Sequence, residues 1–83
     1  MEKILIDNIG RVHTTAMGIE RIKRNIGIDD IDVVAWCKDK ILAANVIERR
    51  GKNWYVHADG YVVTINASSY TVITVHKKGK ILI

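Results

Sequence analysis

The chain has 83 residues, enough for a single hydrophobic core, and we expect residues 1–83 to form one domain. A hydrophobic share of 48% with no proline excludes a disordered chain, and no apolar run is long enough to cross a membrane. The net charge of +4 favours an anionic partner, and the single cysteine excludes an internal disulfide. Because acidic residues near the start do not fit a signal peptide, we expect a soluble cytoplasmic protein.

The first part of the chain has apolar residues at helical spacing. Isoleucine, leucine and valine between positions 4 and 12 predict a short helix within residues 1–12. The run His13-Thr14-Thr15 follows, and we interpret it as a capping segment whose hydroxyls accept from the free amides of a second helix. The isoleucines of that helix share one face, and Gly27 is placed to end it.

A third helix is predicted over residues 29–43. Three aspartates between positions 29 and 32 mark its start, because carboxylates are favourable at the positive end of the helix dipole. Its buried stripe is expected to contain Val33 or Val34, then Cys37 and Ile41. We therefore interpret Cys37 as a core residue and not as a nucleophile.

The second half of the chain reads as strands. Asp59-Gly60 between the alternating runs 53–58 and 61–67 predicts a hairpin, because a type I′ turn needs positive φ at both central positions. A two-residue loop fixes the register, and it pairs Ala58 with Tyr61, Val56 with Val63, Trp54 with Ile65, His57 with Val62, Tyr55 with Thr64, and Asn53 with Asn66.

Further strands are predicted on both sides of this hairpin. Val46 to Arg50 forms the first strand, Gly51-Lys52 turns, and a final strand runs from Tyr70 to Lys77. Residues 81–83 are either a short extra strand or an apolar tail. The element order predicts an α+β fold, with two to three N-terminal helices packed on one face of a three- to five-stranded antiparallel β-meander.

The predicted register gives the sheet one apolar and one polar face. Trp54, Val56, Val63 and Ile65 are expected to lie against the helices, with Ile73 and Val75 beside them in the last strand. The opposite face is expected to carry Asn53, Tyr55, His57, Thr64, Asn66, Tyr70, Thr74 and His76. This polar face is the candidate functional surface.

Binding to RNA, or to a protein that itself handles nucleic acid, is the function we expect for this surface. Cations suit phosphates, and an aromatic ring suits a stacked base. The candidate binding residues are Arg49, Arg50, Lys52, Tyr55, Thr64, Asn66, Tyr70, Thr74 and Lys77.

Catalysis is the alternative interpretation. His57 and His76 suit proton transfer near neutral pH, and with Tyr55 and Lys52 they would make a metal-independent ribonuclease. The three histidines lack the local spacing of zinc ligands and there are no clustered cysteines, so we expect neither a metal nor a cofactor. The sequence does not predict an oligomeric state.

Four runs carry a resemblance to a known family. They are His-Thr-Thr at 13–15, Gly-Ile-Glu-Arg-Ile-Lys-Arg-Asn at 18–25, Gly-Lys-Asn-Trp-Tyr at 51–55 and Ile-Asn-Ala-Ser-Ser-Tyr-Thr-Val-Ile-Thr-Val-His at 65–76. With these runs the chain resembles a family of small bacterial proteins of unknown function, which implies no activity. The order of elements is also similar to the small toxin ribonucleases of the RelE, colicin and barnase type. That likeness implies catalytic roles for Lys52, Tyr55, His57 and His76.

Two other functions fit the same pattern. A winged-helix DNA-binding protein would use residues 18–26 and 29–43 as its helix pair and residues 46–65 as its wing, but the aspartates at the start of the recognition helix would repel phosphates. A small inhibitor of phage or mobile-element origin would bind a nucleic-acid enzyme through the sheet face or the acidic helix start.

Overall fold

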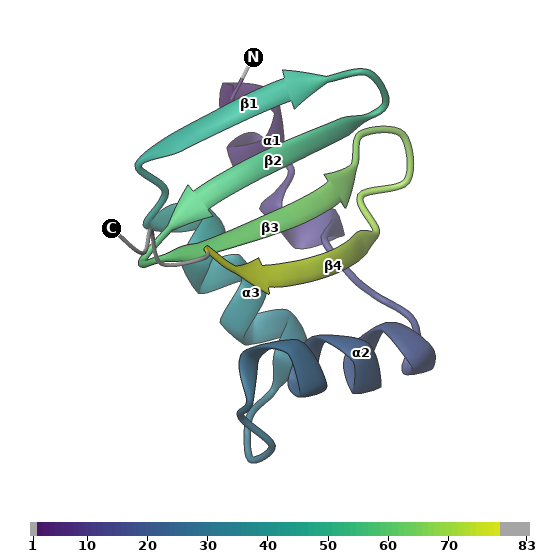
Figure 1. Ribbon diagram of the computed structural model, residues 1–83. Helices are drawn as coiled ribbons and strands as arrows, with labels where there is room; N and C mark the ends of the chain where they lie inside the picture. The colour runs from purple at the N-terminus through teal and green to yellow at the C-terminus, as the bar shows by residue number, and fades with distance from the viewer. Residues whose placement is uncertain (1, 79–83) are drawn as a thin grey trace, which may run out of the picture.

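The structure, a computed structural model, describes residues 2–78 and is an α+β fold (Figure 1). Its elements are α1 (Glu2–Asp7), a 3₁₀ helix (Ile9–Arg11), α2 (Ala16–Ile26), α3 (Val33–Leu42), β1 (Val46–Arg50), β2 (Asn53–Ala58), β3 (Tyr61–Asn66) and β4 (Val72–Lys77). The strands form one antiparallel sheet in the order β1-β2-β3-β4. The predicted fold class is therefore confirmed, while the prediction for residues 81–83 lies outside the described residues.

The ends of the long helices follow the predicted capping chemistry. The Thr15 hydroxyl accepts from the Gly18 amide at 3.0 Å, and Gly27 ends α2 in the left-handed conformation at φ 73°. In α3 the Asp32 carboxylate accepts from the Ala35 amide at 3.1 Å, so the helix begins at Val33 and not at position 29. A cap at Asp32 leaves the two earlier aspartates in the preceding loop.

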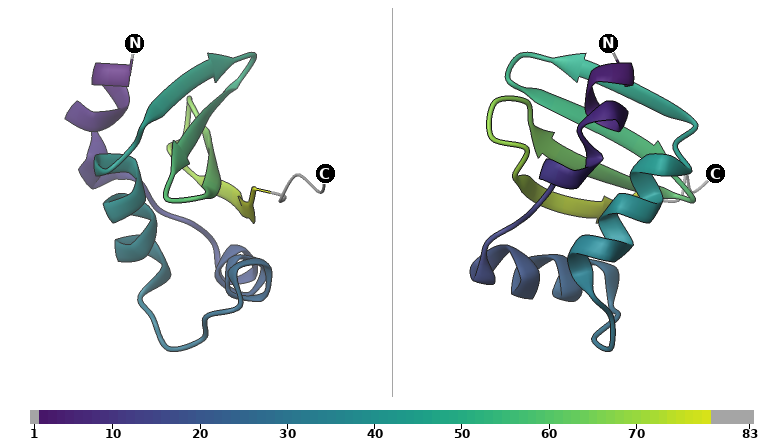
Figure 2. Two further views of the ribbon diagram at one scale, coloured as in Figure 1. Left: turned by 60° about the vertical axis from the view of Figure 1, so that its left-hand side comes forward. Right: turned by 180° about the vertical axis from the view of Figure 1, so that it is seen from behind.

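The helices are arranged in two ways around the sheet (Figure 2). Helices α1 and α3 cover one face, and α3 buries Val33, Cys37 and Ile41 there, as the sequence predicts. Helix α2 packs along β4, at the edge of the sheet. The other face of the sheet is left uncovered by helices, and Figure 1 looks directly onto it.

The β4 edge is closed by groups from the N-terminal half of the chain. Asn25 Nδ2 donates to the Val75 carbonyl at 3.1 Å, and the Thr14 hydroxyl donates to the Val72 carbonyl at 2.9 Å. His13 forms a parallel bridge with Thr71, donating from its amide to the Tyr70 carbonyl and accepting from the Val72 amide. Backbone groups that would otherwise form an unpaired strand edge are thereby satisfied.

The hairpin has the predicted turn and register. Asp59 and Gly60 have φ values of 52° and 82°, as a type I′ turn requires. All six predicted cross-strand pairs are present. Trp54, Val56, Val63 and Ile65 are each at most 2% exposed, so the apolar face lies against the helices as expected.

The prediction for the last strand is wrong at Tyr70 and Ile73. A register shift opposite Thr64 and Ile65 places Val72 and Val75 on the core face, three positions apart, and leaves Ile73 37% exposed. Tyr70 precedes the strand with φ 61° and is 6% exposed, with its ring centroid 5.3 Å from that of Trp54. Simple alternation could not predict this irregularity, and Tyr70 is a core residue instead of a binding residue.

Trp54 is expected to carry a large share of the stability. Replacing it with alanine removes a 2%-exposed side chain from between the helices and the sheet, and should cost about 3–5 kcal/mol of unfolding free energy. Trp36 is only half-buried, so Trp36→Ala is the matched control and should cost less. Urea unfolding measures both, and a cost below about 1 kcal/mol for Trp54→Ala would contradict the packing described.

Candidate functional site

The uncovered face of the sheet, here called the open face, presents its side chains in three rows across the strands. The histidine row contains Val46, His57, Val62 and His76; the tyrosine row contains Glu48, Tyr55, Thr64 and Thr74; the asparagine row contains Arg50, Asn53 and Asn66. The surface is therefore mostly polar, as the hairpin register predicts.

Tyr55 is held by a cation and an amide. The Arg50 guanidinium carbon lies 4.2 Å from the centroid of the Tyr55 ring, and Asn53 Nδ2 donates to the tyrosine hydroxyl at 3.4 Å. Asn53 Oδ1 is buried without a hydrogen-bond partner among the described residues. The result is a stacked Arg50–Tyr55 pair on the open face, next to an unsatisfied acceptor.

His57 is paired with a carboxylate. Its Nε2 lies 3.0 Å from Glu48 Oε1, and because a carboxylate only accepts, the imidazole is the donor. The hydrogen bond from His57 lowers the pKa of Glu48; desolvation opposes this shift, and the charge of Arg50 at 3.9 Å adds to it. The Glu48 charge is thus balanced from two sides.

The two predicted catalytic histidines share the open face but are not neighbours. Val62 pairs with His57 on one side and with His76 on the other. Two inter-strand spacings separate the imidazole-bearing residues, about 10 Å between their Cα atoms. The two imidazoles are therefore not placed to pass a proton directly from one to the other.

The predicted cations are divided between the two sides of the sheet. Arg49 pairs with Trp54, lies with its guanidinium carbon 5.7 Å from that ring, and donates from Nε to the Gly51 carbonyl at 3.1 Å. Lys77 pairs with Tyr61, which packs against the core. Both predicted binding residues therefore belong to the covered side, whereas Arg50 is on the open face and Lys52 is exposed in the adjoining turn.

The two predicted threonines are less accessible than expected. Thr64 is only 8% exposed, between Tyr55 and Thr74 in the tyrosine row. The Thr74 hydroxyl accepts from Asn25 Nδ2 of α2 at 3.2 Å. Thr64 and Thr74 therefore pack within the sheet and against α2 and offer little surface to a ligand. Asn66, at the edge of the open face, is half-buried.

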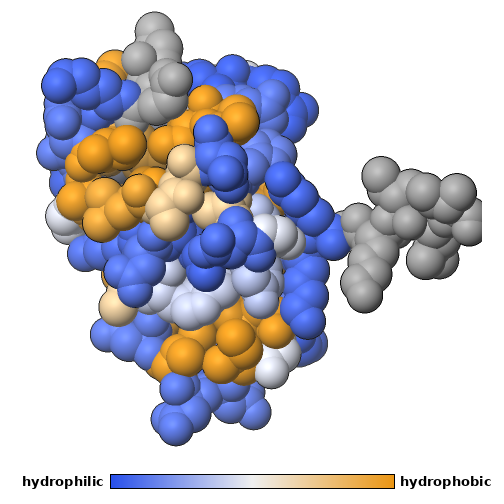
Figure 3. Space-filling view, turned by 90° about the vertical axis from the view of Figure 1, so that its left-hand side faces the viewer, coloured by the Kyte–Doolittle hydropathy of each residue, from blue (hydrophilic) through white to orange (hydrophobic). Residues whose placement is uncertain are grey.

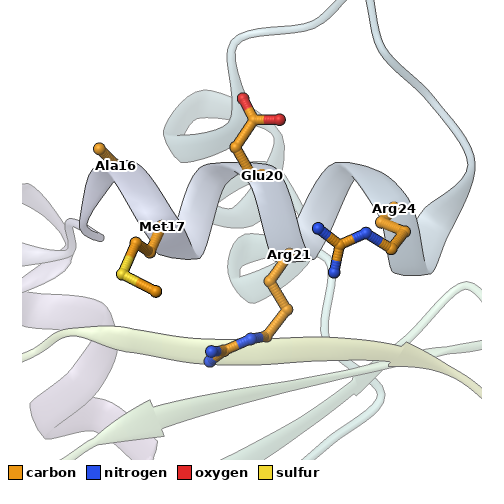
Figure 4. A pocket seen from close by; sticks show the side chains of 5 residues that line it. All are labelled: Ala16, Met17, Glu20, Arg21 and Arg24. Carbon is orange, nitrogen blue, oxygen red and sulfur yellow. The ribbon is translucent and has the colours of Figure 1, made fainter.

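Other surfaces are less suited to a ligand. A groove of about 340 Å³ runs along α2 and is lined, among the described residues, by Ala16, Met17, Glu20, Arg21 and Arg24. Figure 4 shows Met17 and Arg21 on one side of the helix and Glu20 on the other, and all five lining residues belong to α2.

Apolar side chains gather beside the N-terminus (Figure 3), and Ile4 of α1 and Leu42 of α3 are 50% and 59% exposed.

Metal and thiol chemistry have little support in residues 2–78. No group of three or more histidine, cysteine, aspartate or glutamate residues in this range could hold a metal ion. Burial raises the pKa of the Cys37 thiol to about 12, which makes it a poor nucleophile. No helix in the described part of the chain is long and apolar enough to span a membrane.

Comparison with known proteins gives one match. Residues 6–76 match the family described as "Protein of unknown function (DUF3781)". The chain belongs to this family. The matched range contains the whole open face and every predicted site residue except Lys77, and the description assigns no activity. No curated protein and no solved structure matches the chain.

The pairing of His57 with Glu48 has a measurable consequence. We expect the pKa of Glu48 to lie below its ordinary value in the folded protein and to rise toward that value in His57→Ala, because the largest cause of the shift is removed. A lowered carboxyl pKa contributes stability above the unfolded pKa, and this contribution is lost as pH falls through the folded pKa. A carboxyl-detected NMR titration measures it, and an unchanged Glu48 pKa in His57→Ala would contradict the assigned hydrogen bond.

Proposed function

We propose that the open face binds single-stranded RNA. The observation that carries this proposal is the Arg50–Tyr55 pair, a guanidinium 4.2 Å from an aromatic centroid on a face that the helices leave uncovered. Single-stranded RNA exposes unstacked bases, and proteins hold such bases against aromatic rings and guanidinium planes. A base bound here would stack on the Arg50 guanidinium, which itself lies over the Tyr55 ring.

The neighbouring groups fit the remaining parts of a nucleotide. Asn53 and Asn66 lie beside the stacked pair, where amides suit base edges and ribose hydroxyls. Lys52 is exposed in the turn that follows Arg50 and suits a phosphate. The Glu48 carboxylate, which would repel phosphates, is paired with His57 and Arg50.

The composition of the face favours RNA over a protein partner. The cores of protein–protein interfaces are depleted in charged residues and more apolar than the rest of the surface. In the three rows, the apolar members are Val46 and Val62, both in the histidine row. A protein partner would have to desolvate Glu48, Arg50 and two asparagines to cover the rest.

Adjacent arginines on β1 provide a matched pair of variants. Arg50→Ala removes the stacked guanidinium from the open face and should raise the Kd for a short single-stranded RNA about 5- to 150-fold, equal to about 1–3 kcal/mol. Arg49→Ala removes the same charge from the opposite side of the strand and should change the Kd little. Fluorescence anisotropy measures both, and equal losses in the two variants would show that net charge alone, not the open face, attracts the RNA.

Salt dependence tests the phosphate contact separately. The log–log slope of affinity against salt should be about −0.7 per neutralised phosphate, so Lys52→Ala should flatten the slope by about 0.7. The measurement is the same anisotropy titration at several salt concentrations. Absence of binding by the unmodified protein at low salt would refute the RNA proposal and leave a protein partner as the better explanation.

A further inference from the structure

A second polar cluster joins the start of α2 to the turn before β4. His13 Nε2 lies 3.2 Å from the Thr71 hydroxyl, which lies 2.7 Å from the Ser69 hydroxyl. Asn66 Oδ1 in turn accepts from the Ser69 amide at 2.9 Å, which leaves the Ser69 hydroxyl free to donate to Thr71. The His-Thr-Thr and Ile-Asn-Ala-Ser-Ser-Tyr-Thr runs, 58 residues apart at His13 and Thr71, therefore meet in one hydrogen-bonded chain that capping alone does not require.

The position of the imidazole fixes its tautomer. His13 Nδ1 lies 2.8 Å from the Arg11 carbonyl oxygen, and because a carbonyl only accepts, Nδ1 carries a proton. In the neutral ring Nε2 is then the acceptor, and it faces the Thr71 hydroxyl. An imidazole with one nitrogen held by a carbonyl and the other directed at a hydroxyl has the arrangement of a general base.

This cluster continues the asparagine row of the open face. Asn66 pairs with Asn53 on one side, and on the other its side chain contacts Ser69, which contacts Thr71 and through it His13. From Arg50 on β1 to His13 beyond β4 the row crosses four inter-strand spacings, about 19 Å. A strand of RNA held at the Arg50–Tyr55 pair can therefore extend along one row to the imidazole.

We propose that His13 is a general base that activates the ribose 2′-hydroxyl of RNA bound along this row. The inference rests on the proposed RNA binding and adds a catalytic residue to it. His13 is exposed, and its backbone is fixed on both sides by the bridge to Tyr70 and Val72, so a substrate hydroxyl can replace that of Thr71 at Nε2 without moving the chain.

The reaction is an internal transesterification. His13 Nε2 takes the proton of the 2′-hydroxyl, the 2′-oxygen forms a bond to the adjacent phosphorus, and the bond from phosphorus to the 5′-oxygen breaks. The departing 5′-oxygen takes a proton from water, and the proton on His13 neutralises the hydroxide that remains. The products are a 2′,3′-cyclic phosphate and a 5′-hydroxyl, with no oxidant, reductant or metal consumed.

A cation lies near this end of the sheet. The Lys52 carbonyl accepts from the Ala67 amide at 2.8 Å, so the β1–β2 turn lies beside the turn before β4. Lys52 suits a phosphate of the bound strand at this end of the sheet. His57 donates from Nε2 to the Glu48 carboxylate, so Nδ1 is the acceptor nitrogen of its neutral ring, and His57→Gln is the comparison for His13→Gln.

The test compares binding and cleavage in the same full-length variants. Purified protein is incubated in EDTA with a single-stranded RNA oligomer, and product ends are identified by mass spectrometry. We expect cyclic phosphate ends from the unmodified protein. His13→Gln, purified identically, should cleave about 10²–10⁴ times more slowly while its Kd stays within about threefold. Free imidazole should restore part of the cleavage in His13→Ala.

The outcomes separate the inference from the function on which it rests. RNA binding without cleavage by the unmodified protein overturns the role of His13 and leaves the binding proposal intact. Cleavage that persists in His13→Gln, or that is lost in His57→Gln or His76→Gln instead, also overturns it. No binding at all removes both proposals. Thermal melting checks folding, and because the bridge at His13 uses backbone groups, Thr71→Val and His13→Gln should both remain folded.

Discussion

The two-residue turn at Asp59-Gly60 is the constraint on which the architecture depends. Positive φ at both positions, 52° and 82°, makes a tight turn whose twist matches that of the strands. A loop longer by one residue would move every side chain of β3 to the opposite face. The turn therefore decides that Trp54 enters the core and that Tyr55 stands on the open face, where Arg50 stacks on it.

Closure of the β4 edge links the rest of the chain to that sheet. Asn25 and Thr14 satisfy strand carbonyls, and His13 bridges to the segment before the strand. Such closure protects an edge that would otherwise pair with another chain. It also has a chemical consequence, because the same bridge brings an imidazole to the hydroxyls of Ser69 and Thr71. The bridge at His13 thus extends the asparagine row of the open face beyond the sheet.

Local chemistry explains what the sequence could and could not predict. The turn at Asp59-Gly60, the cap at Thr15 and the stop at Gly27 each depend on a few neighbouring residues, and all three were predictable. The register shift at β4 and the packing of Tyr70 against Trp54 are tertiary features that strand alternation does not reveal. The contact of His13 with Thr71 joins distant segments and was likewise hidden. The placement of Arg49 and Arg50 on opposite faces of β1, by contrast, follows from strand alternation alone.

The central claim is that the open face, and not the helical side, is the RNA-binding surface. Backbone amide NMR of the ¹⁵N-labelled protein, titrated with a short single-stranded RNA, tests it most directly. The account predicts that the largest shift changes fall on Arg50, Tyr55 and Asn66 and continue to Thr71 and His13, with α1 and α3 little affected. Changes concentrated on α3 or on the groove side of α2, with the asparagine and tyrosine rows unmoved, would contradict it.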